Sequence, residues 1–156
     1  MIIAVSGTPG TGKTTLSKKL AKKLNYTYLD VASLIKQNKI AESYDKKRKC
    51  YVVDIKKLNK ILIREIKKYS NLIVDSHLSH YLPKKYVDLC IITECDLKEL
   101  EKRLKKKKYN KAKVRENLDC EIFDICLNEA KETGHKVLVV DTTKGINIDK
   151  IIKKLK

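Results

Sequence analysis

One stretch near the amino end combines glycines with a single lysine and several threonines. It reads GTPGTGKTT from Gly7 to Thr15 and contains three of the five glycines in the chain. It matches the pattern G-x-x-x-x-G-K-[ST], in which backbone N–H groups cradle phosphate oxygens at the start of a helix. The match predicts that Lys13 supplies charge to the β- and γ-phosphates of ATP and that the Thr14 hydroxyl binds Mg²⁺.

An acidic residue stands where it could organise that metal ion. The apolar run from Asn71 to Val74 is followed by Asp75, and an acid at the carboxyl end of a parallel strand faces the ligand crevice of such a sheet. Asp75 would then hold a water of the Mg²⁺ shell or position the attacking group. The alternative is a turn or capping aspartate, because Asp is common at strand ends. His77 and His80 follow closely, and taken alone each is more typical of local structure.

Short apolar runs and amphipathic segments alternate along the whole chain. The runs rich in Ile, Val and Leu predict strands over 2–6, 26–30, 71–75, 89–93 and 136–141. The segments with apolar residues three and four apart predict helices over 15–24, 55–69, 97–107, 111–133 and 148–155. Such alternation predicts an α/β three-layer fold with a parallel sheet in a single domain, 1–156. The polar stretches 37–50 and 105–110 do not fit this pattern and are interpreted as lids or binding loops.

Charge and cysteine usage limit the classes of partner and compartment. The 36 Lys and Arg against 19 Asp and Glu leave a net charge of +17, which attracts phosphates and nucleic acid; the alternative is that the lysines coat solvated helix faces. The single Phe and the absence of Trp disfavour an RNA-binding module with stacking aromatics. Five cysteines without a C-x-x-C pair, no signal peptide and no apolar span predict a cytoplasmic protein without a membrane segment.

Three stretches together resemble the adenylate kinase isoenzyme 6 family, also called the coilin-interacting nuclear ATPase family, in its archaeal form. They are SGTPGTGKTTLSKKLA, VDSHLSHYLP and KVRENLDCEIFDICLNEA, and the resemblance covers nearly the whole chain. It implies a P-loop nucleoside monophosphate kinase fold with a five-stranded parallel sheet. It also implies that Asp75 and His77 form the family's D-x-H element and act in catalysis alongside Lys13. By the same resemblance the following residues bind ATP: Gly10, Gly12, Lys13, Thr14 and Thr15.

The same resemblance gives roles to the two polar stretches. A region of about 33–54 would bind the nucleoside monophosphate, and a region of about 105–117 would be the lid. Where the family often has phosphate-binding arginines, this chain has Lys36 and Lys107. By the resemblance Lys36 would bind the substrate and Lys107 would bind ATP, although lysine offers only a compact charge in place of a planar fork. Arg103 and Arg115 are alternative phosphate ligands, or ordinary pairs with glutamates along a helix.

The family resemblance also implies an activity. We expect a nucleotide kinase that transfers the γ-phosphoryl of Mg·ATP to AMP, with ATPase activity and a role in small ribosomal subunit maturation, and therefore contacts with a small-subunit ribosomal protein and rRNA. The alternative is an ATPase that acts as a ribosome assembly factor, with kinase activity secondary.

Overall fold

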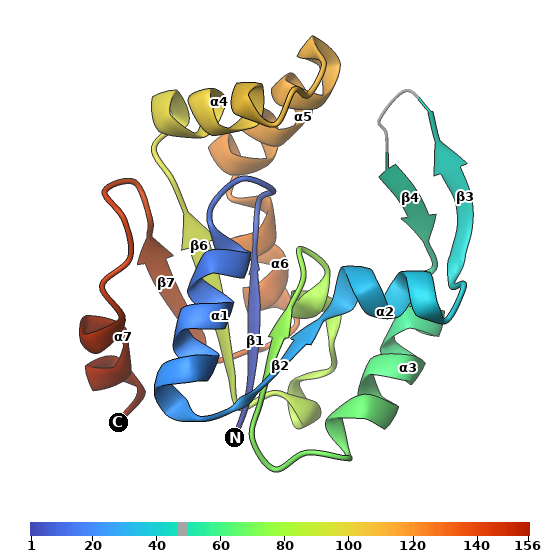
Figure 1. The fold of residues 1–156 in the computed structure, drawn as a ribbon, viewed down its shortest axis with the longest axis vertical. Coiled ribbons are helices and arrows are strands. Elements are labelled where there is room, and N and C mark those ends of the chain that lie inside the picture. The colour runs from blue at the N-terminus through green and yellow to red at the C-terminus, as the bar shows by residue number, and fades with distance from the viewer. Residues whose placement is uncertain (47–49) are drawn as a thin grey trace.

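The centre of the molecule is a five-stranded sheet in which every strand pairing is parallel. The computed structural model describes residues 1–46 and 50–156. The strand order is β2-β5-β1-β6-β7 (Figure 1). The strands are β1 (Ile2–Gly7), β2 (Thr27–Asp30), β5 (Leu72–Asp75), β6 (Leu89–Glu94) and β7 (Val137–Asp141). This confirms the predicted α/β class and the five-stranded parallel sheet.

Helices cover both faces of the sheet, which explains why its strands are continuous apolar runs. Alternate residues of the central strands enter two cores, so that Ile3 and Val5 pack on one side and Ala4 on the other. The first core includes α1 (Lys13–Leu24) and α7 (Ile148–Leu155). The second includes α2 (Val31–Gln37), α3 (Ile55–Ile66) and α6 (Ile125–Glu132). Two 3-10 turns, η1 (Ser79–Tyr81) and η2 (Lys84–Tyr86), connect β5 to β6.

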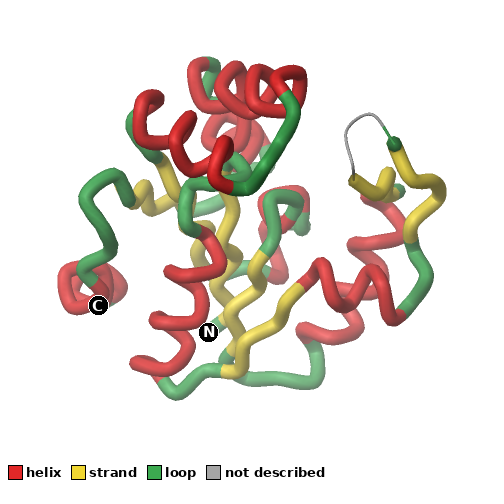
Figure 2. The backbone as a smooth tube through the Cα atoms, turned by 45° about the horizontal axis from the view of Figure 1, so that its top comes forward, coloured by secondary structure: helices red, strands yellow, loops and turns green. Residues whose placement is uncertain are grey.

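Two further helices lie beyond the carboxyl ends of the strands. They are α4 (Leu97–Lys106) and α5 (Lys111–Ile122), and Figures 1 and 2 show them across the edge of the sheet where β1 turns into α1. They share a small core of their own, formed by Cys95, Leu100, Leu104 and Val114. The predicted lid region of about 105–117 therefore spans the turn between these helices and most of α5.

The prediction of one helix over 111–133 is wrong. The chain bends between α5 and α6, where Asp124 adopts a left-handed conformation with a φ of 49°. Aspartate tolerates this conformation better than most residues. Because periodicity hardly changes across a single left-handed residue, the helical pattern on either side conceals the break.

The stretch 33–54 contains structure that the periodicity did not predict. It begins in α2 and continues into an antiparallel hairpin of β3 (Ala41–Asp45) and β4 (Cys50–Val53), which stands apart from the main sheet (Figure 1). Of the lysine-rich run 46–49, residues 47–49 lie outside the described residues.

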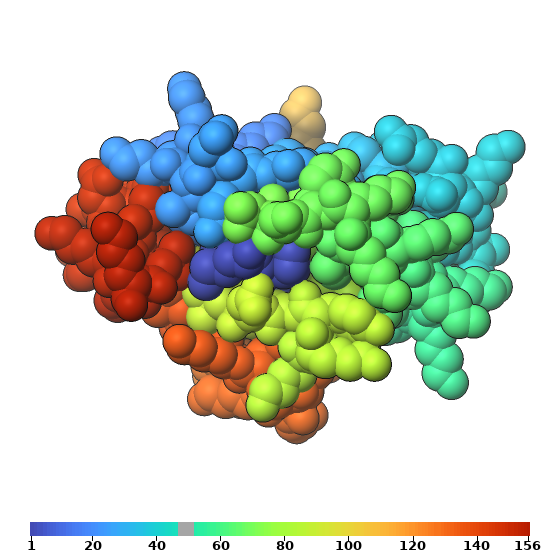
Figure 3. Space-filling model, turned by 90° about the horizontal axis from the view of Figure 1, so that it is seen from below, coloured from blue at the N-terminus to red at the C-terminus, as the bar shows by residue number. Residues whose placement is uncertain are grey.

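The amino end of the chain lies at the opposite end of the sheet from the turn into α1. Seen from below in Figure 3, the start of β1 in dark blue lies between the blue segment that leads into β2 and the yellow-green segment that leads into β6. The Met1 amino group bonds the Ser70 carbonyl oxygen, and Ile2 N donates to Asp88 Oδ2 at 2.6 Å. No helix among the described residues is long and apolar enough to cross a membrane.

Candidate active site

The loop between β1 and α1 requires glycine for two different physical reasons. A Cβ at Gly7 would lie 2.5 Å from Thr93 Oγ1 and 2.6 Å from the Thr93 carbonyl oxygen of the neighbouring strand, so no side chain fits there. Gly12 caps α1 with a φ of 86°, a conformation that residues with a Cβ rarely adopt. The loop therefore turns sharply from β1 into α1 and presents its backbone at the helix amino end, which is an anion-binding arrangement.

Threonine side chains hold this phosphate-binding loop against the sheet. The Thr11 hydroxyl donates to the Thr8 carbonyl oxygen at 2.6 Å and lies 2.6 Å from Thr93 Oγ1. From the far side, Thr142 Oγ1 donates to the Thr11 carbonyl oxygen at 2.7 Å. Thr11 is fully buried in these contacts, so side-chain hydrogen bonds on both sides hold the loop against the sheet.

Lys13 lies at the start of α1 with its ammonium group folded back over the loop. Its Nζ donates to the Thr8 carbonyl oxygen at 3.1 Å. Desolvation by burial lowers the pKa of Lys13 to about 8, and the nearby carboxylate of Asp75 acts in the opposite direction. The side chain is half-buried. Lys13 is therefore largely protonated at pH 7 and available to an anion.

Asp75 ends β5 directly beside the loop and is 5% exposed. Its Oδ2 accepts hydrogen bonds from Thr14 Oγ1 and from Tyr28 Oη, both at 2.8 Å. Because the Thr14 hydrogen points at the carboxylate, the hydroxyl lone pairs remain for a cation. Among the described residues no group of three or more His, Cys, Asp and Glu could hold a metal ion. The donor set fits Mg²⁺, which keeps several waters and takes phosphate oxygens as further ligands.

The loop opens into a cavity of about 400 Å³. Three parts of the chain line it: the loop and α1, the carboxyl half of α4, and the segment after β7. The lining residues are Gly10, Gly12, Lys13, Thr14, Thr15, Lys19, Arg103, Lys107, Thr142, Gly145 and Ile146. Four cationic side chains thus surround a space bounded by glycines and one isoleucine, which suits a ligand that carries phosphates and an apolar ring.

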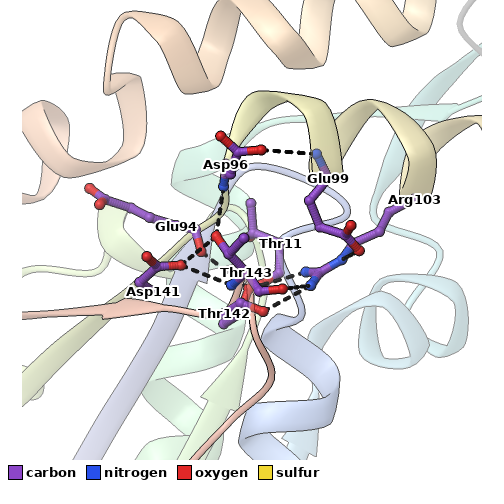
Figure 4. Close-up of polar contacts among 8 residues, drawn as sticks. All are labelled: Thr11, Glu94, Asp96, Glu99, Arg103, Asp141, Thr142 and Thr143. Atoms are coloured by element: carbon purple, nitrogen blue, oxygen red, sulfur yellow. Dashed lines mark hydrogen bonds and ion pairs between the residues drawn. The ribbon is translucent and has the colours of Figure 1, made fainter.

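Arg103 joins α4 to the segment after β7 (Figure 4). Its Nε donates to Glu99 Oε1 at 3.1 Å, and its Nη2 donates to the Thr142 carbonyl oxygen at 2.8 Å. Nη1 donates to Thr142 Oγ1 at 3.1 Å, and that hydroxyl in turn bonds the phosphate-binding loop. Arg103 therefore couples the position of α4 to the position of the loop.

Comparison with known proteins agrees with this geometry. A family profile described as an AAA domain matches residues 3–124. The chain is 37% identical to a "Putative adenylate kinase" of Methanocaldococcus jannaschii over 100% of this chain and 86% of that protein. It is 34% identical to an "Adenylate kinase isoenzyme 6 homolog" of Dictyostelium discoideum over 89% of this chain and 79% of that protein. The chain belongs to the adenylate kinase isoenzyme 6 family. It is therefore a member of a P-loop nucleotide kinase family, and that membership implies ATP binding.

Solved structures support the same fold at lower sequence identity. A shikimate kinase from Acinetobacter baumannii superposes with a TM-score of 0.68 at 17% identity over 99% of this chain and 90% of that chain. A deoxyadenosine kinase from M. mycoides gives a TM-score of 0.63 at 19% identity over 99% and 98% of the two chains. Both similarities show the fold of this chain alone and carry no information about its substrate.

Most of the residues expected to bind the nucleotide lie together. The expected loop residues and Lys107 all line the cavity, and Asp75 contacts Thr14 at its edge. Lys36 does not join them. It is exposed in the last turn of α2 and is not among the residues that line the cavity. Its expected role in substrate binding therefore stays a prediction.

The two histidines after β5 have different surroundings. His77 is exposed. Desolvation by surrounding protein, with the positive charges of Lys13, His80 and Lys113, lowers the pKa of His77 to about 4. The imidazole is therefore neutral at pH 7. His80 is buried between Ser6 Oγ and Glu129 Oε2, both at 2.7 Å, as expected of a residue with a role in local structure.

The two arginines that were considered as alternative phosphate ligands lie in different places. Arg103 lines the cavity, whereas Arg115 pairs with Asp119 at 3.0 Å on an exposed face of α5. Five contributors were missed: Tyr28, which donates to Asp75, and four residues that line the cavity, Lys19, Thr142, Gly145 and Ile146. The signal that could have indicated Thr142 is its place directly after a predicted strand, the same position that indicated Asp75. Nothing in the local sequence distinguishes Tyr28 from the other tyrosines.

Proposed function

We propose that this protein transfers the γ-phosphoryl group of Mg·ATP to a nucleoside monophosphate, with AMP as the preferred acceptor and two ADP as products. The observation that carries the proposal is the meeting of three groups at one cavity: the phosphate-binding loop with Lys13, the Thr14–Asp75 pair, and the cations of α4. The names of the relatives, adenylate kinases and adenylate kinase isoenzyme 6 homologs, favour AMP as the acceptor.

The proposed chemistry consists of positioning and charge neutralisation, with no covalent intermediate. The loop N–H groups and Lys13 would hold the β- and γ-phosphates, and Lys107 would approach the same oxygens from α4. Thr14 would bind Mg²⁺ directly and Asp75 would hold one of its waters. Bound Mg²⁺ would supply positive charge between the β- and γ-phosphate oxygens. The base and ribose of ATP would lie in the part of the cavity between Arg103 and Ile146.

The acceptor would bind on the Asp75 side of the phosphate-binding loop. There, α2 leads from β2 to the β3–β4 hairpin, which projects beyond the same edge of the sheet as α4 and α5 (Figure 1). We assign the region of about 33–54 to monophosphate binding and the region of about 105–117 to the lid. Lys36, exposed on α2, would contribute a positive charge toward the phosphate of AMP.

The test is a coupled measurement of ADP formation from ATP with and without AMP. The proposed kinase forms ADP much faster when AMP is present and requires Mg²⁺. An ADP rate that does not depend on AMP or on any other nucleoside monophosphate would contradict the kinase proposal and favour the alternative, an ATPase that acts as a ribosome assembly factor.

His77→Ala is expected to lower phosphoryl transfer about 10²-fold while the melting temperature changes little, as for the loss of a positioned proton-transfer group. Within the described residues the exposed ring makes no hydrogen bond that would stabilise the fold, and its lowered pKa leaves the imidazole neutral at pH 7. His77→Gln is a matched variant that keeps a polar side chain. If His77→Ala unfolds the protein while the remaining folded material keeps full activity, the histidine is structural.

We also propose association with a small-subunit ribosomal protein and nearby rRNA. The net charge of +17 exceeds what a nucleotide requires, and Lys105, Lys106 and Lys108 are exposed where α4 ends. Binding to an rRNA fragment at two salt concentrations tests this, because RNA affinity falls with a log–log slope of about −0.7 per phosphate contact. Absence of binding at low salt would contradict it.

A further inference from the structure

Tyr28 reaches the catalytic end of the sheet from a strand that carries no residue of the phosphate-binding motif. β2 lies next to β5, with Tyr28 opposite Ile73 and Asp30 opposite Asp75. The phenol extends toward the carboxyl end of β5 and donates from Oη to Asp75 Oδ2 at 2.8 Å. Ile73 lies two residues before Asp75, and β2 is the strand next to β5. The Tyr28 side chain therefore reaches the acid that is expected to hold a water of the Mg²⁺ shell.

Both donors to Asp75 bond the same carboxylate oxygen. Thr14 Oγ1 and Tyr28 Oη each lie 2.8 Å from Oδ2. Within the described residues no hydrogen bond is donated to the other oxygen, Oδ1. A carboxylate with one oxygen fixed by two donors has a defined plane and direction, and its second oxygen is free to accept from a metal-bound water. Without the phenol, a single threonine hydroxyl would have to orient the whole group.

The tyrosine ring is itself held in place. It packs, half-buried, against the core formed by α1 and α7, in which Tyr26 and Leu24 also take part. Lys18 Nζ lies 5.8 Å from the ring centroid on the side of α1. Burial and the hydrogen bond to Asp75 raise the pKa of Tyr28, so the phenol keeps its proton and remains a donor over the physiological pH range.

We propose that Tyr28 is a positioning residue for the metal–nucleotide complex: it fixes Asp75 so that Thr14 keeps its hydroxyl hydrogen on the carboxylate and its lone pairs toward Mg²⁺. The inference rests on the proposed function only in that ATP and Mg²⁺ occupy the cavity beside Thr14. It differs from the simpler interpretation of Tyr28 as a core residue whose hydroxyl bonds the nearest acceptor. A core residue would affect stability alone, whereas a positioning residue also affects metal dependence.

The test compares Tyr28→Phe with Tyr26→Phe. Both variants remove one phenol hydroxyl from the same segment and keep the ring in the same core, but within the part of the chain that the structure describes the Tyr26 hydroxyl bonds only Met1 Sδ, at 3.8 Å. We measure binding of a non-hydrolysable ATP analogue while Mg²⁺ is varied, and Mn²⁺ binding to the protein–analogue complex by electron paramagnetic resonance. Tyr28→Phe is expected to raise the half-saturating concentration of either cation about tenfold, as for the loss of one hydrogen bond to a charged group.

Two further readouts separate positioning from structure. Analogue binding without metal is expected to change less than about twofold, because the loop backbone and Lys13 provide it. The melting temperature reports the structural loss separately and is expected to be lower in Tyr28→Phe than in Tyr26→Phe, because a hydrogen bond to a buried carboxylate is removed. Unchanged cation dependence in Tyr28→Phe, an equal change in Tyr26→Phe, or an equal loss of metal-free binding would each overturn the proposal. Because none of these readouts depends on turnover, they remain decisive even if the wild-type protein forms no ADP from AMP, a result that would contradict the proposed function alone.

Discussion

Lys13→Ala is expected to lower the rate of ADP formation from ATP and AMP about 10²- to 10³-fold, the loss that follows removal of one preorganised electrostatic contact to the transition state. Lys13 is the motif lysine, and its ammonium group lies over the loop within 3.1 Å of the Thr8 carbonyl oxygen. Charge develops on the phosphate oxygens during transfer, so the loss should appear in kcat more than in ATP affinity. A coupled assay at saturating ATP and AMP measures it.

The matched control for this variant is Lys22→Ala. Lys22 is exposed on the same helix and does not line the cavity. The Lys22→Ala variant therefore removes the same charge from the protein without changing the proposed site. Its turnover should stay within about twofold of the wild type, because long-range effects of exposed charges are screened. Equal turnover in Lys13→Ala and the wild type would contradict the site assignment.

Asp75→Asn is expected to lower Mg²⁺-dependent turnover about 10²-fold, again the scale of one lost electrostatic contact, while metal-free ATP binding changes little. The amide keeps the shape of the carboxylate and still offers an acceptor to Thr14 and Tyr28, so the fold is retained. It removes the negative charge beside the metal shell, whereas the loop backbone continues to hold the phosphates. Turnover against Mg²⁺ concentration and calorimetric ATP binding without metal measure the two effects.

The same variant has a defined effect on pH dependence. The carboxylate of Asp75 raises the pKa of Lys13 against the stronger effect of burial, which brings it to about 8. Without that negative charge the pKa falls further, so Lys13 loses its proton at a lower pH and the alkaline limit of activity moves to lower pH. Asp149→Asn is the control, because Asp149 is an exposed acid on α7 that pairs with Lys23 of α1. An unchanged alkaline limit in Asp75→Asn would contradict the electrostatic coupling between Asp75 and Lys13.

Local sequence was enough to predict the elements whose formation depends on local chemistry. The three central strands, β1, β5 and β6, are apolar runs whose residues are mostly buried because each face of the sheet packs on helices, whereas the edge strands β2 and β7 are partly exposed. The phosphate-binding loop was predictable because Gly7 and Gly12 occupy backbone positions that tolerate no side chain, for reasons of space and of φ respectively. Neither the hairpin β3–β4 nor the break at Asp124 is marked by a proline or a glycine. The local sequence therefore carries no turn signal at these two places, and neither was predicted.

The residues of the candidate site come together only through the order of the strands and the packing of the helices. Thr14, Asp75 and Tyr28 come from three distant parts of the chain and form one hydrogen-bonded group only because β2, β5 and β1 are neighbours in that order. Likewise, Arg103 and Thr142 meet because α4 crosses the edge of the sheet above β7. By itself the sequence determined the phosphate-binding loop, the acid at the end of β5 and the α/β class, since those depend on residue type and short spacing. The tertiary structure alone decided which tyrosine orients that acid and which arginine faces the cavity, because strand order and helix packing follow from the joint burial of apolar faces far apart in the chain.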